Sequence, residues 1–395
     1  MFKGKHILII VENLPVPFDR RVWQEANTLK EAGAKVSIIC PKMKGYNQSF
    51  ERINDIDIYR HPLPAEGKGA LSYLSEYSVA LFWEFFLSLK IYCKKRFQVI
   101  QGCNPPDLIF LPAFFYKILG VKYVFDHHDI NPELYIAKYN KKGFFYKFLL
   151  LAERLTFVCA NYSIATNESY KEIAIRRGKM PPDKVQVVRS GPKLDRLEPG
   201  PGNTKYKKDR SFLVGYVGVI GEQEGLDLLL EAAKIITDLR KDVQFAIVGD
   251  GTELETIKAT TALMALDDYV DFYGRVDDAT LVEILNTADL CVNPDRPTEM
   301  NNLSTMNKIM EYMALKKPIV QFNLKEGKLS AQDASLYADN TSTKDFADKI
   351  LWLIDHPEER KKMGEIGYDR IINTLSWKHE SRNLLNLYTK IFELK

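Results

Sequence analysis

Polar side chains gather where one apolar run of the sequence ends. Residues 122–126 read KYVFD and lead directly into His127, His128 and Asp129. Adjacent strand residues point to opposite faces, so these two histidines cannot easily share one metal ion. We expect the imidazole of His128 to face and contact a ligand while His127 packs beneath it. The alternative is that both histidines only cap the strand end through hydrogen bonds.

Two arginines begin a predicted helix after the first apolar run. Asp19 suits the N-cap, and Arg20 and Arg21 follow in the first turn, where positive charge opposes the helix dipole. A bound anion such as a pyrophosphate at this helix N-terminus would resolve the mismatch, which makes both arginines phosphate candidates. The alternative is that one of them pairs with Glu25 one turn later.

The segment of residues 293–320 is the richest in side chains that can bind a ligand. Asn307 and Lys308 fall in the first turn of a predicted helix, and Glu311 follows one turn later on nearly the same face. A carboxylate there can accept two ribose hydroxyls, while Lys308 and helix N–H groups can hold phosphate. The alternative is a surface pair. We favour ligand binding because the helix directly follows a strand end and a long polar loop.

Glycines separate a strand from a helix in the second half of the chain. Gly215, Gly218 and Gly221 stand three residues apart, where the backbone can approach a phosphate. The spacing does not match GxGxxG, so it gives little support to NAD binding. The sequence VGDG at residues 248–251 is a further strand-to-helix turn, and by itself it fits a structural role as well as a functional one.

Short apolar runs alternate with helical patterns, which indicates parallel sheets covered on both faces. A first series of predicted strands is followed by a Gly-, Pro- and Lys-rich segment, and then the pattern restarts. Ligands bind such sheets at the carboxyl ends of the strands, where the residues above stand. The predicted strands are residues 6–12, 35–41, 97–103, 122–129, 162–167 and 185–190, then 212–218, 243–251, 270–276, 290–294 and 318–322.

We therefore predict an α/β protein of two doubly wound, Rossmann-like domains facing each other across a cleft. The first domain spans residues 1–190, the linker residues 191–211 and the second domain residues 212–376. The last segment, residues 377–395, reads as an amphipathic helix long enough to cross back to the first domain.

Composition and charge fit this organisation. The 395 residues suit two domains, and the net charge of +3 hides an asymmetry. Residues 1–190 hold 28 Lys and Arg against 18 Asp and Glu, or +10, whereas residues 191–395 hold 27 against 34, or −7. A basic half suits an anionic surface or ligand.

The cysteines and apolar segments point to the cytoplasm. The five cysteines are odd in number and form no CxxC pair, so they read as free thiols in a reducing compartment. We expect neither a signal peptide nor a transmembrane segment.

Taken together, these motifs resemble the retaining family-4 glycosyltransferases of the GT-B fold, and among them the subset that builds polysaccharides. The resemblance spans nearly the whole chain. It is carried by DRRV with EAG after the first strand, the pair His128-Asp129, VGDG, FYGRV at residues 272–276, and above all KIMEYMALKKPIV at residues 308–320. It implies a carboxyl-terminal domain that binds the nucleotide sugar and an amino-terminal domain that receives the acceptor, often at a membrane.

The resemblance also implies roles for individual residues. Glu311 would bind the donor ribose, and Arg275 with Val276 would lie beside the base. His128, with Asp129 as its neighbour in the catalytic pair, would face the transferred sugar. Gly221 would approach the diphosphate.

The sequence departs from the family in its acidic pair. The family's two glutamates, eight residues apart, would put the first acid at position 303, where this chain has Leu303. The carboxylate expected near the sugar hydroxyls is therefore missing or moved, with Glu299 as the candidate replacement.

A second departure concerns the charge that meets the diphosphate. The Arg and Lys that the family carries after Gly218 appear here as Val219 and Glu224. Lys308, Arg20 and Arg21 are the cations that could replace them.

The function expected from this resemblance is retaining transfer of a hexosyl or N-acetylhexosaminyl group from a nucleotide sugar, with UDP as the expected nucleotide. The acceptor would be a saccharide or a lipid-linked saccharide in cell-surface polysaccharide or glycoconjugate biosynthesis. We expect no cofactor, no metal and no nucleic-acid partner. The alternatives are a GT-B-like nucleotide-sugar epimerase and a non-catalytic nucleotide-sugar-binding partner of a transferase.

Two aromatic, basic segments raise the question of a membrane. Residues 71–97 and 139–151 could lie against an anionic bilayer at the inner face of the membrane. The alternative, that both are helices covering the sheet, fits their patterns slightly better.

Overall fold

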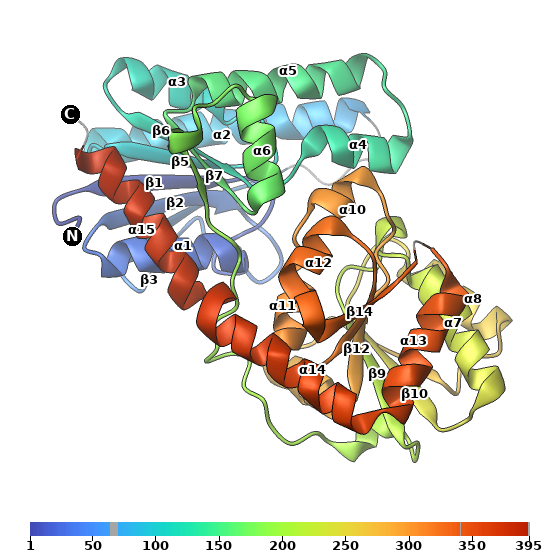
Figure 1. The fold of residues 1–395 in the computed structure, drawn as a ribbon. Helices are drawn as coiled ribbons and strands as arrows, with labels where there is room; N and C mark the ends of the chain where they lie inside the picture. Colours follow the sequence, from blue (N-terminus) through green and yellow to red (C-terminus); the bar gives the residue numbers. More distant parts are fainter. Residues whose placement is uncertain (64–69, 340, 394–395) are drawn as a thin grey trace. The chain divides into compact units, whose positions relative to one another are not determined.

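Every apolar run assigned above to a strand forms one, with ends that differ by a few residues. The computed structural model describes residues 1–63, 70–339 and 341–393, without the side chains of residues 70–76. The chain divides into unit 1, Met1–Ser190 with Glu380–Lys395, and unit 2, Gly191–His379. Each unit holds one sheet (Figure 1).

The sheet of unit 1 has the strand order β3-β4-β2-β1-β5-β6-β7-β8 and is parallel except for the β3–β4 hairpin. Nearly all side chains of its central strands are buried, as continuous apolar runs predict. The strands are β1 (His6–Val11), β2 (Lys35–Pro41), β3 (Phe50–Ile53), β4 (Ile56–His61), β5 (Val99–Cys103), β6 (Lys122–His127), β7 (Tyr162–Ala165) and β8 (Val185–Val187).

Helices cover both faces of this sheet (Figure 1). One face carries α1, and α2, α3 and α5 cover the other. The helices of this part are α1 (Arg20–Glu31), α2 (Ala70–Lys94), α3 (Phe110–Ile118), α4 (Asn131–Tyr139), α5 (Phe144–Cys159), α6 (Glu168–Arg176) and the 3-10 turn η1 (Pro182–Lys184).

The sheet of unit 2 is parallel throughout, in the order β11-β10-β9-β12-β13-β14. One face packs against α7 and α13, and the other against α9 and α11. The strands are β9 (Phe212–Val217), β10 (Val243–Val248), β11 (Val270–Gly274), β12 (Leu290–Asn293), β13 (Ile319–Phe322) and β14 (Ser335–Ala338).

The helices and helical turns of unit 2 precede, separate or follow these strands. They are η2 (Thr204–Lys207), η3 (Glu222–Glu224), α7 (Leu226–Leu239), α8 (Leu254–Leu263), α9 (Asp278–Thr287), α10 (Glu299–Leu303), α11 (Asn307–Ala314), α12 (Lys325–Ala331), η4 (Gln332–Ala334), α13 (Thr343–Asp355), α14 (Pro357–Arg370) and the π-helical turn η5 (Ile371–Leu375).

The strand order fixes where each sheet can bind a ligand. In unit 1 the chain builds outward from β1 through β2, then returns to the other side of β1 as β5. In unit 2 the same reversal separates β9 from β12. Loops diverge at such a switch point, so the carboxyl ends of β1 and β5, and of β9 and β12, are the expected binding positions. The predicted doubly wound α/β class is confirmed for both sheets.

The last helix returns to unit 1 as predicted. Helix α15 (Trp377–Glu393) begins in unit 2, and its residues from Glu380 onward belong to unit 1. There the fully buried Tyr388 donates a hydrogen bond from Oη to Oε1 of Gln101 at 2.6 Å. The carboxylate of Glu380 accepts from the backbone N–H of Arg189 at 3.0 Å.

The predicted linker, residues 191–211, lies in unit 2 and is packed there. Its Leu197 and Tyr206 are buried beside α9 and α11. The backbone N–H of Asn203 donates to the hydroxyl of Thr287 at 2.8 Å. Among the residues that the structure describes, no helix is both long enough and apolar enough to cross a membrane.

Candidate active site

A buried ionic cluster stands at the carboxyl edge of the unit 1 sheet. Asp19 caps α1 by accepting from the N–H of Val22 at 3.0 Å, as predicted. The guanidinium of Arg21, in the first turn of α1, lies 3.0 Å from Asp126 and 3.1 Å from Glu25. The pair with Glu25 was one predicted alternative, and the contact with Asp126 adds a second carboxylate.

Arg21 lies beside two carboxyl groups, those of Glu25 and Asp126, and only one of these is ionised. Burial raises the pKa of Glu25 to about 8, and the carboxylate of Asp126 adds to the shift. Burial would also raise the pKa of Asp126, but Arg21 and His128 hold it well below its usual range. Asp126 therefore carries the negative charge and Glu25 retains its proton at neutral pH.

Arg21 has further partners inside the protein. Its Nη1 donates to the carbonyl of Val188 at 2.9 Å and to the hydroxyl of Ser190 at 3.2 Å. A phosphate at Arg21 would have to displace these bonds or add to them. Arg20 is exposed at the same helix end. The phosphate role of both arginines stays a prediction.

His128 is oriented by the same cluster. Its Nε2 lies 2.9 Å from Oδ2 of Asp126 and 3.0 Å from Nε of Arg21. Burial lowers the pKa of His128, but the charge of Asp126 and its hydrogen bond to the ring together raise it above its ordinary value. Within the described residues, Nδ1 of His128 has no hydrogen-bond partner, so it is the ring nitrogen that can meet a ligand.

His127 takes the opposite side of β6, as the strand periodicity predicts. Its imidazole is fully buried among the rings of Phe125, Phe157 and Tyr170, with centroids 5.0–5.3 Å away. Burial lowers the pKa of His127 to about 3, so the ring is neutral. His127 is a packing residue, and His128 alone of the two histidines contacts Asp126.

Asn104, after β5, holds the loop that carries His128 and Asp129. Its Oδ1 accepts from the backbone N–H of His128 at 2.7 Å and of Asp129 at 3.2 Å. Its Nδ2 donates to the carbonyl of Asp129 at 2.6 Å and to Oδ1 of Asp107 at 2.8 Å. Burial raises the pKa of Asp129. The predicted catalytic pair, His128 and Asp129, is thus held by a residue that the sequence analysis did not select.

One trio of this edge has groups that metals bind. Cys103, Asp126 and His128 offer ligand atoms within 4.8 Å of one another. The guanidinium of Arg21 already contacts both Asp126 and His128 and supplies the positive charge that Asp126 requires. The donor set therefore fits a buried ion pair better than a metal centre.

In unit 2, a mostly buried lysine lies at the carboxyl ends of β9 and β12. Nζ of Lys308, in the first turn of α11, lies 2.8 Å from Oδ1 of Asp295, with side chains only 10% and 2% exposed. It also lies 3.4 Å from the hydroxyl of Tyr216. Burial would lower the pKa of Lys308, but Asp295 raises it above its ordinary value, so the ammonium is charged.

Polar atoms beside this lysine have no partner. Oδ2 of Asp295 and both side-chain polar atoms of Asn293 are buried, with no hydrogen bond within the described part of the chain. Buried polar groups are normally paired, so unpaired ones at a strand end indicate a place where a ligand or water bonds. Neither residue was predicted, although both stand in the NPDRP run before α10.

The loop after β9 brings an acid to the same place. A Cβ at Gly221 would lie 2.7 Å from Oε2 of Glu224, so the missing side chain makes room for this carboxylate. Burial raises the pKa of Glu224, and the charge of Lys308 opposes the shift. The predicted approach of Gly221 to a diphosphate therefore requires Glu224 to move or to share Lys308.

Close packing of the backbone explains why glycine stands at positions 249 and 251 of the VGDG sequence. A Cβ at Gly249 would collide with the carbonyl of Gly218, and one at Gly251 with the carbonyl of Ile220. The loops after β9 and β10 lie against each other here, which larger residues would prevent.

Glu311 lies one turn beyond Lys308 on α11 and is paired. Its carboxylate accepts from Nη2 of Arg196, whose Nη1 also lies 3.1 Å from Asp278. A ribose at Glu311 would share this carboxylate with Arg196. The first-turn residue Asn307 is exposed.

The remaining predicted donor residues lie at other strand ends and loops. Arg275, directly after β11, is exposed, and Val276 packs against the core beside α9. Glu299 is exposed at the start of the short helix α10, which ends at Leu303. Their donor-binding roles stay predictions, as does the replacement of the missing acid by Glu299.

Comparison with known proteins places the chain in a family. A glycosyl transferase 4-like domain matches residues 19–191, and a glycosyl transferases group 1 domain matches residues 211–356. The chain belongs to the family-4-like glycosyltransferases of the GT-B fold. The first match falls in unit 1 and the second in unit 2.

Individual relatives are distant in sequence. The capsular polysaccharide biosynthesis glycosyltransferase CapM of Staphylococcus aureus is 25% identical over 388 residues, which cover 91% of this chain and 97% of CapM. The alpha-D-kanosaminyltransferase of Streptomyces kanamyceticus is 27% identical over 163 residues, only 41% of either chain.

Solved structures show the same fold over nearly the whole chain. Sucrose-phosphate synthase from Thermosynechococcus elongatus has a TM-score of 0.80 at 18% identity and covers 99% of this chain and 100% of that one. Anabaena HepE, solved in complex with UDP-glucose, has a TM-score of 0.73 at 13% identity, covering 98% and 99%.

Proposed function

We propose that this glycosyltransferase moves a hexosyl or N-acetylhexosaminyl group from a UDP-sugar to a saccharide or lipid-linked acceptor, with retention at the anomeric carbon. The product would belong to a cell-surface polysaccharide or glycoconjugate. CapM, by its name a capsular polysaccharide enzyme, supports the pathway class. The UDP-glucose in HepE supports the nucleotide.

The observation that carries the donor site is the buried Lys308 with its unsatisfied neighbours. A charged ammonium, a half-paired Asp295 and an unpaired Asn293 stand at the switch point of the unit 2 sheet. A nucleoside diphosphate brings negative charge for Lys308, and the sugar brings hydroxyls that can both donate and accept hydrogen bonds.

Lys308 would act on the leaving group. The bond between the anomeric carbon and the diphosphate breaks as the sugar gains oxocarbenium character, and negative charge collects on the UDP oxygens. A fixed, water-poor ammonium stabilises that charge more in the transition state than in the donor. Asp295 holds the ammonium in place before the donor arrives.

His128 would bind the transferred sugar through Nδ1–H. Its Nε2 is committed to Asp126, so the ring is oriented and its charged form is stabilised. The acceptor hydroxyl would attack from the side that the diphosphate leaves, which gives retention, and its proton passes to the departing diphosphate. Asp129 completes the loop and is held by Asn104.

We propose that no metal takes part, because Lys308 supplies the charge that a divalent ion would otherwise bring to the diphosphate. The basic first half of the sequence supports work at the inner face of an anionic membrane. Glu311, Arg275 and Val276 remain the proposed contacts to ribose and base.

The test is turnover of single UDP-sugars with and without candidate acceptors, following UDP release and the anomeric configuration of the product by NMR. We expect acceptor-dependent UDP release, an axial or equatorial bond that matches the donor, and a large loss in His128→Ala. Isomerised donor without acceptor would indicate an epimerase. Donor binding with no transfer, unchanged by His128→Ala, would indicate a non-catalytic partner.

A further inference from the structure

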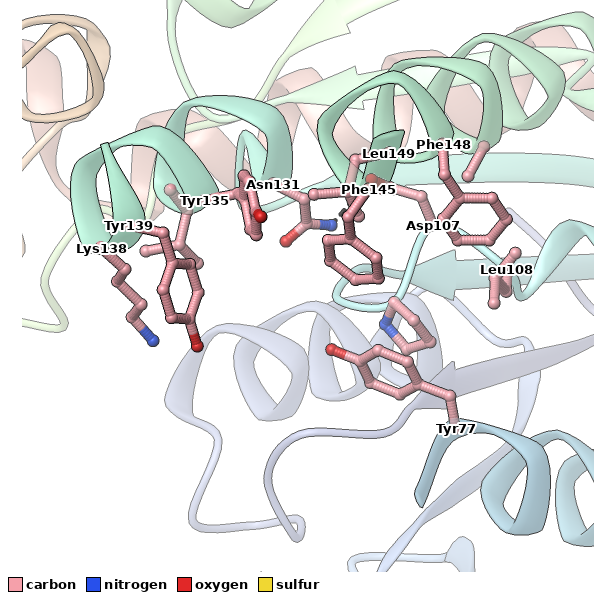
Figure 2. Close-up of a pocket in the computed structure, with 13 residues that line it drawn as sticks. Tyr77, Asp107, Leu108, Asn131, Tyr135, Lys138, Tyr139, Phe145, Phe148 and Leu149 are labelled. Carbon is pink, nitrogen blue, oxygen red and sulfur yellow. Dashed lines mark hydrogen bonds between the residues drawn. The ribbon is translucent and has the colours of Figure 1, made fainter. Parts of the chain in front are cut away.

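Unit 1 contains a pocket that the proposed donor chemistry does not use. It has a volume of about 260 Å³ and lies between α4, α5, the start of α2 and the loop after β5. Figure 2 shows the rings of Tyr77 and Phe145 on opposite sides of it, with Lys138 and Tyr139 extending from α4. The lining residues are Tyr77, Pro106, Asp107, Leu108, Asn131, Leu134, Tyr135, Lys138, Tyr139, Phe145, Phe148, Leu149 and Ala152.

The lining suits hydrocarbon rather than sugar. Most of these side chains are aromatic or aliphatic. The two buried polar ones, Asp107 and Asn131, bond to each other at 2.7 Å, and Asp107 also accepts from Asn104. A saccharide needs several polar partners inside its site, whereas an alkyl or isoprenoid chain needs only apolar contact.

The pocket borders an exposed apolar surface. Phe148, one of its walls, belongs to α5, whose outward side chains Phe144, Leu151 and Val158 are 87%, 54% and 66% exposed. Helix α3 packs beside α5 and exposes Phe114 and Ile118 at 58% and 74%. We call this surface of α3 and α5 the apolar face. Large exposed apolar side chains gathered on neighbouring helices indicate a binding surface.

One lysine lines the pocket, and further lysines follow it in the sequence. Lys138 is part of the lining, and Lys141, Lys142 and Lys147 follow along the chain, all exposed. Acidic residues are absent from the described stretch 134–152. An apolar cavity beside lysines is complementary to a ligand with a hydrocarbon chain and a phosphate.

The pocket is also joined to the loop of His128. Asn104 donates to Asp107 in the pocket wall and accepts from the backbone N–H groups of His128 and Asp129. A ligand in the pocket would thus lie on the other side of the residue that fixes the proposed catalytic pair.

We propose that this pocket binds the hydrocarbon chain of a phosphate-bearing lipid. The lipid carries the acceptor saccharide, and the ammonium of Lys138 binds its phosphate. This proposal rests on the proposed function and narrows its acceptor to the lipid-linked class. The chain would leave the pocket along the apolar face, where the rest of the lipid can remain in a bilayer.

The probe is farnesyl phosphate, kept at concentrations at which it stays monomeric. Farnesol and inorganic phosphate are each measured separately, as the two arms of the comparison. Binding is measured by thermal shift and calorimetry on the full chain. We expect farnesyl phosphate to bind at least about tenfold more tightly than either arm alone. Inorganic phosphate that binds as well as farnesyl phosphate would overturn the proposal, as would no binding of farnesyl phosphate.

Two substitutions of leucine by tryptophan make a matched pair. Leu149→Trp fills the pocket, whereas Leu263→Trp adds the same bulk to an exposed position of α8 in unit 2, outside both the pocket and the apolar face. We expect Leu149→Trp to weaken farnesyl phosphate binding about tenfold or more and Leu263→Trp to leave it unchanged. Equal affinities in the two variants would show that the lipid binds elsewhere and overturn the pocket assignment.

A variant at the surface tests the same proposal if Leu149→Trp fails to fold. Lys138→Glu lies at an exposed position and should weaken farnesyl phosphate binding while sparing farnesol. A UDP thermal shift on every variant separates the two proposals, because UDP is expected to bind unit 2. Farnesyl phosphate binding without any UDP shift would contradict the proposed donor, and the reverse result would contradict only the lipid site.

Discussion

Removing the ammonium of Lys308 should destabilise the protein and abolish donor binding together. In Lys308→Met the side chain keeps its length, but Asp295, 2% exposed, loses the cation 2.8 Å from its Oδ1. Its Oδ2 has no partner within the described residues, so the whole carboxylate is then unpaired. Breaking a buried ion pair in this way costs about 3–5 kcal/mol, or about 6–20 °C in Tm for a unit of this size.

The assay is thermal and urea unfolding with two reference variants. Lys308→Met combined with Asp295→Leu removes both charges and should recover most of the lost stability, because an apolar pair can replace a buried ion pair. Lys234→Met removes a surface lysine, 42% exposed in its pair with Asp238, and should change stability by less than about 1 kcal/mol.

Two results would refute this reasoning. If Lys308→Met is as stable as Lys234→Met, the pair with Asp295 does not hold the site together. If the double variant folds and still gives the wild-type thermal shift with UDP, Lys308 is a structural residue and the diphosphate charge is met elsewhere, with Arg20 as the next candidate.

Three further substitutions test buried or partly buried ionisable groups. His127→Phe should reduce the loss of stability on acidification. The pKa of His127 is about 3 in the folded protein and 6.5 ordinarily, so the unfolded chain binds the proton first, which costs the wild type up to about 5 kcal/mol as the pH falls through that range. Acid unfolding curves of equal steepness for the two proteins would contradict this. Glu84→Leu should stabilise the protein by about 3 kcal/mol at pH 7 and by little at pH 4, because burial raises the pKa of Glu84 to about 8 and its carboxyl has no partner among the described residues. Urea unfolding midpoints at both pH values test this. A loss of stability at pH 7 would contradict it and indicate that the carboxyl has a partner. Glu224→Gln should tighten UDP binding several-fold in calorimetry, since it removes negative charge beside Lys308, and weaker binding would show that the acid contacts the donor.

Periodicity predicted the sheets well because parallel strands are buried on both faces. The run at residues 35–41 forms β2 with the predicted bounds, and its last six residues are buried. The strands β3, β4 and β14 were not predicted. β3 alternates exposed and half-buried positions, and the two central residues of β14 are half-buried. β4 interrupts its apolar residues with Asp57 and Arg60, so none of the three has the continuous apolar run of a central strand.

The site was predicted in part, for a similar reason. The strand alternation of β6 correctly separates His127 from His128, because it follows from local geometry. The sequence could not show that Asp126, one residue earlier, is the group that orients His128. That contact depends on Arg21, which is 105 residues away and meets Asp126 only because β1 and β6 flank β5.

The same limit applies to unit 2. Helix capping and spacing placed Lys308 and Glu311 on α11, as found. Their partners, Asp295 and Arg196, lie 13 and 115 residues away in loops whose paths no periodicity predicts. The departures from the family pattern at Val219 and Glu224 gave the one sequence signal that a cation must come from elsewhere.

The most direct test of the account is a thermal-shift series with UDP, GDP, dTDP and their sugars, repeated for Glu311→Ala. Ligand binding to the native state raises the melting temperature, so each nucleotide reports on the donor site without knowledge of the acceptor. The account predicts a shift with UDP and UDP-sugars that is lost in Glu311→Ala. No shift with any nucleotide, or a UDP shift unchanged in Glu311→Ala, would contradict the donor site built here around α11.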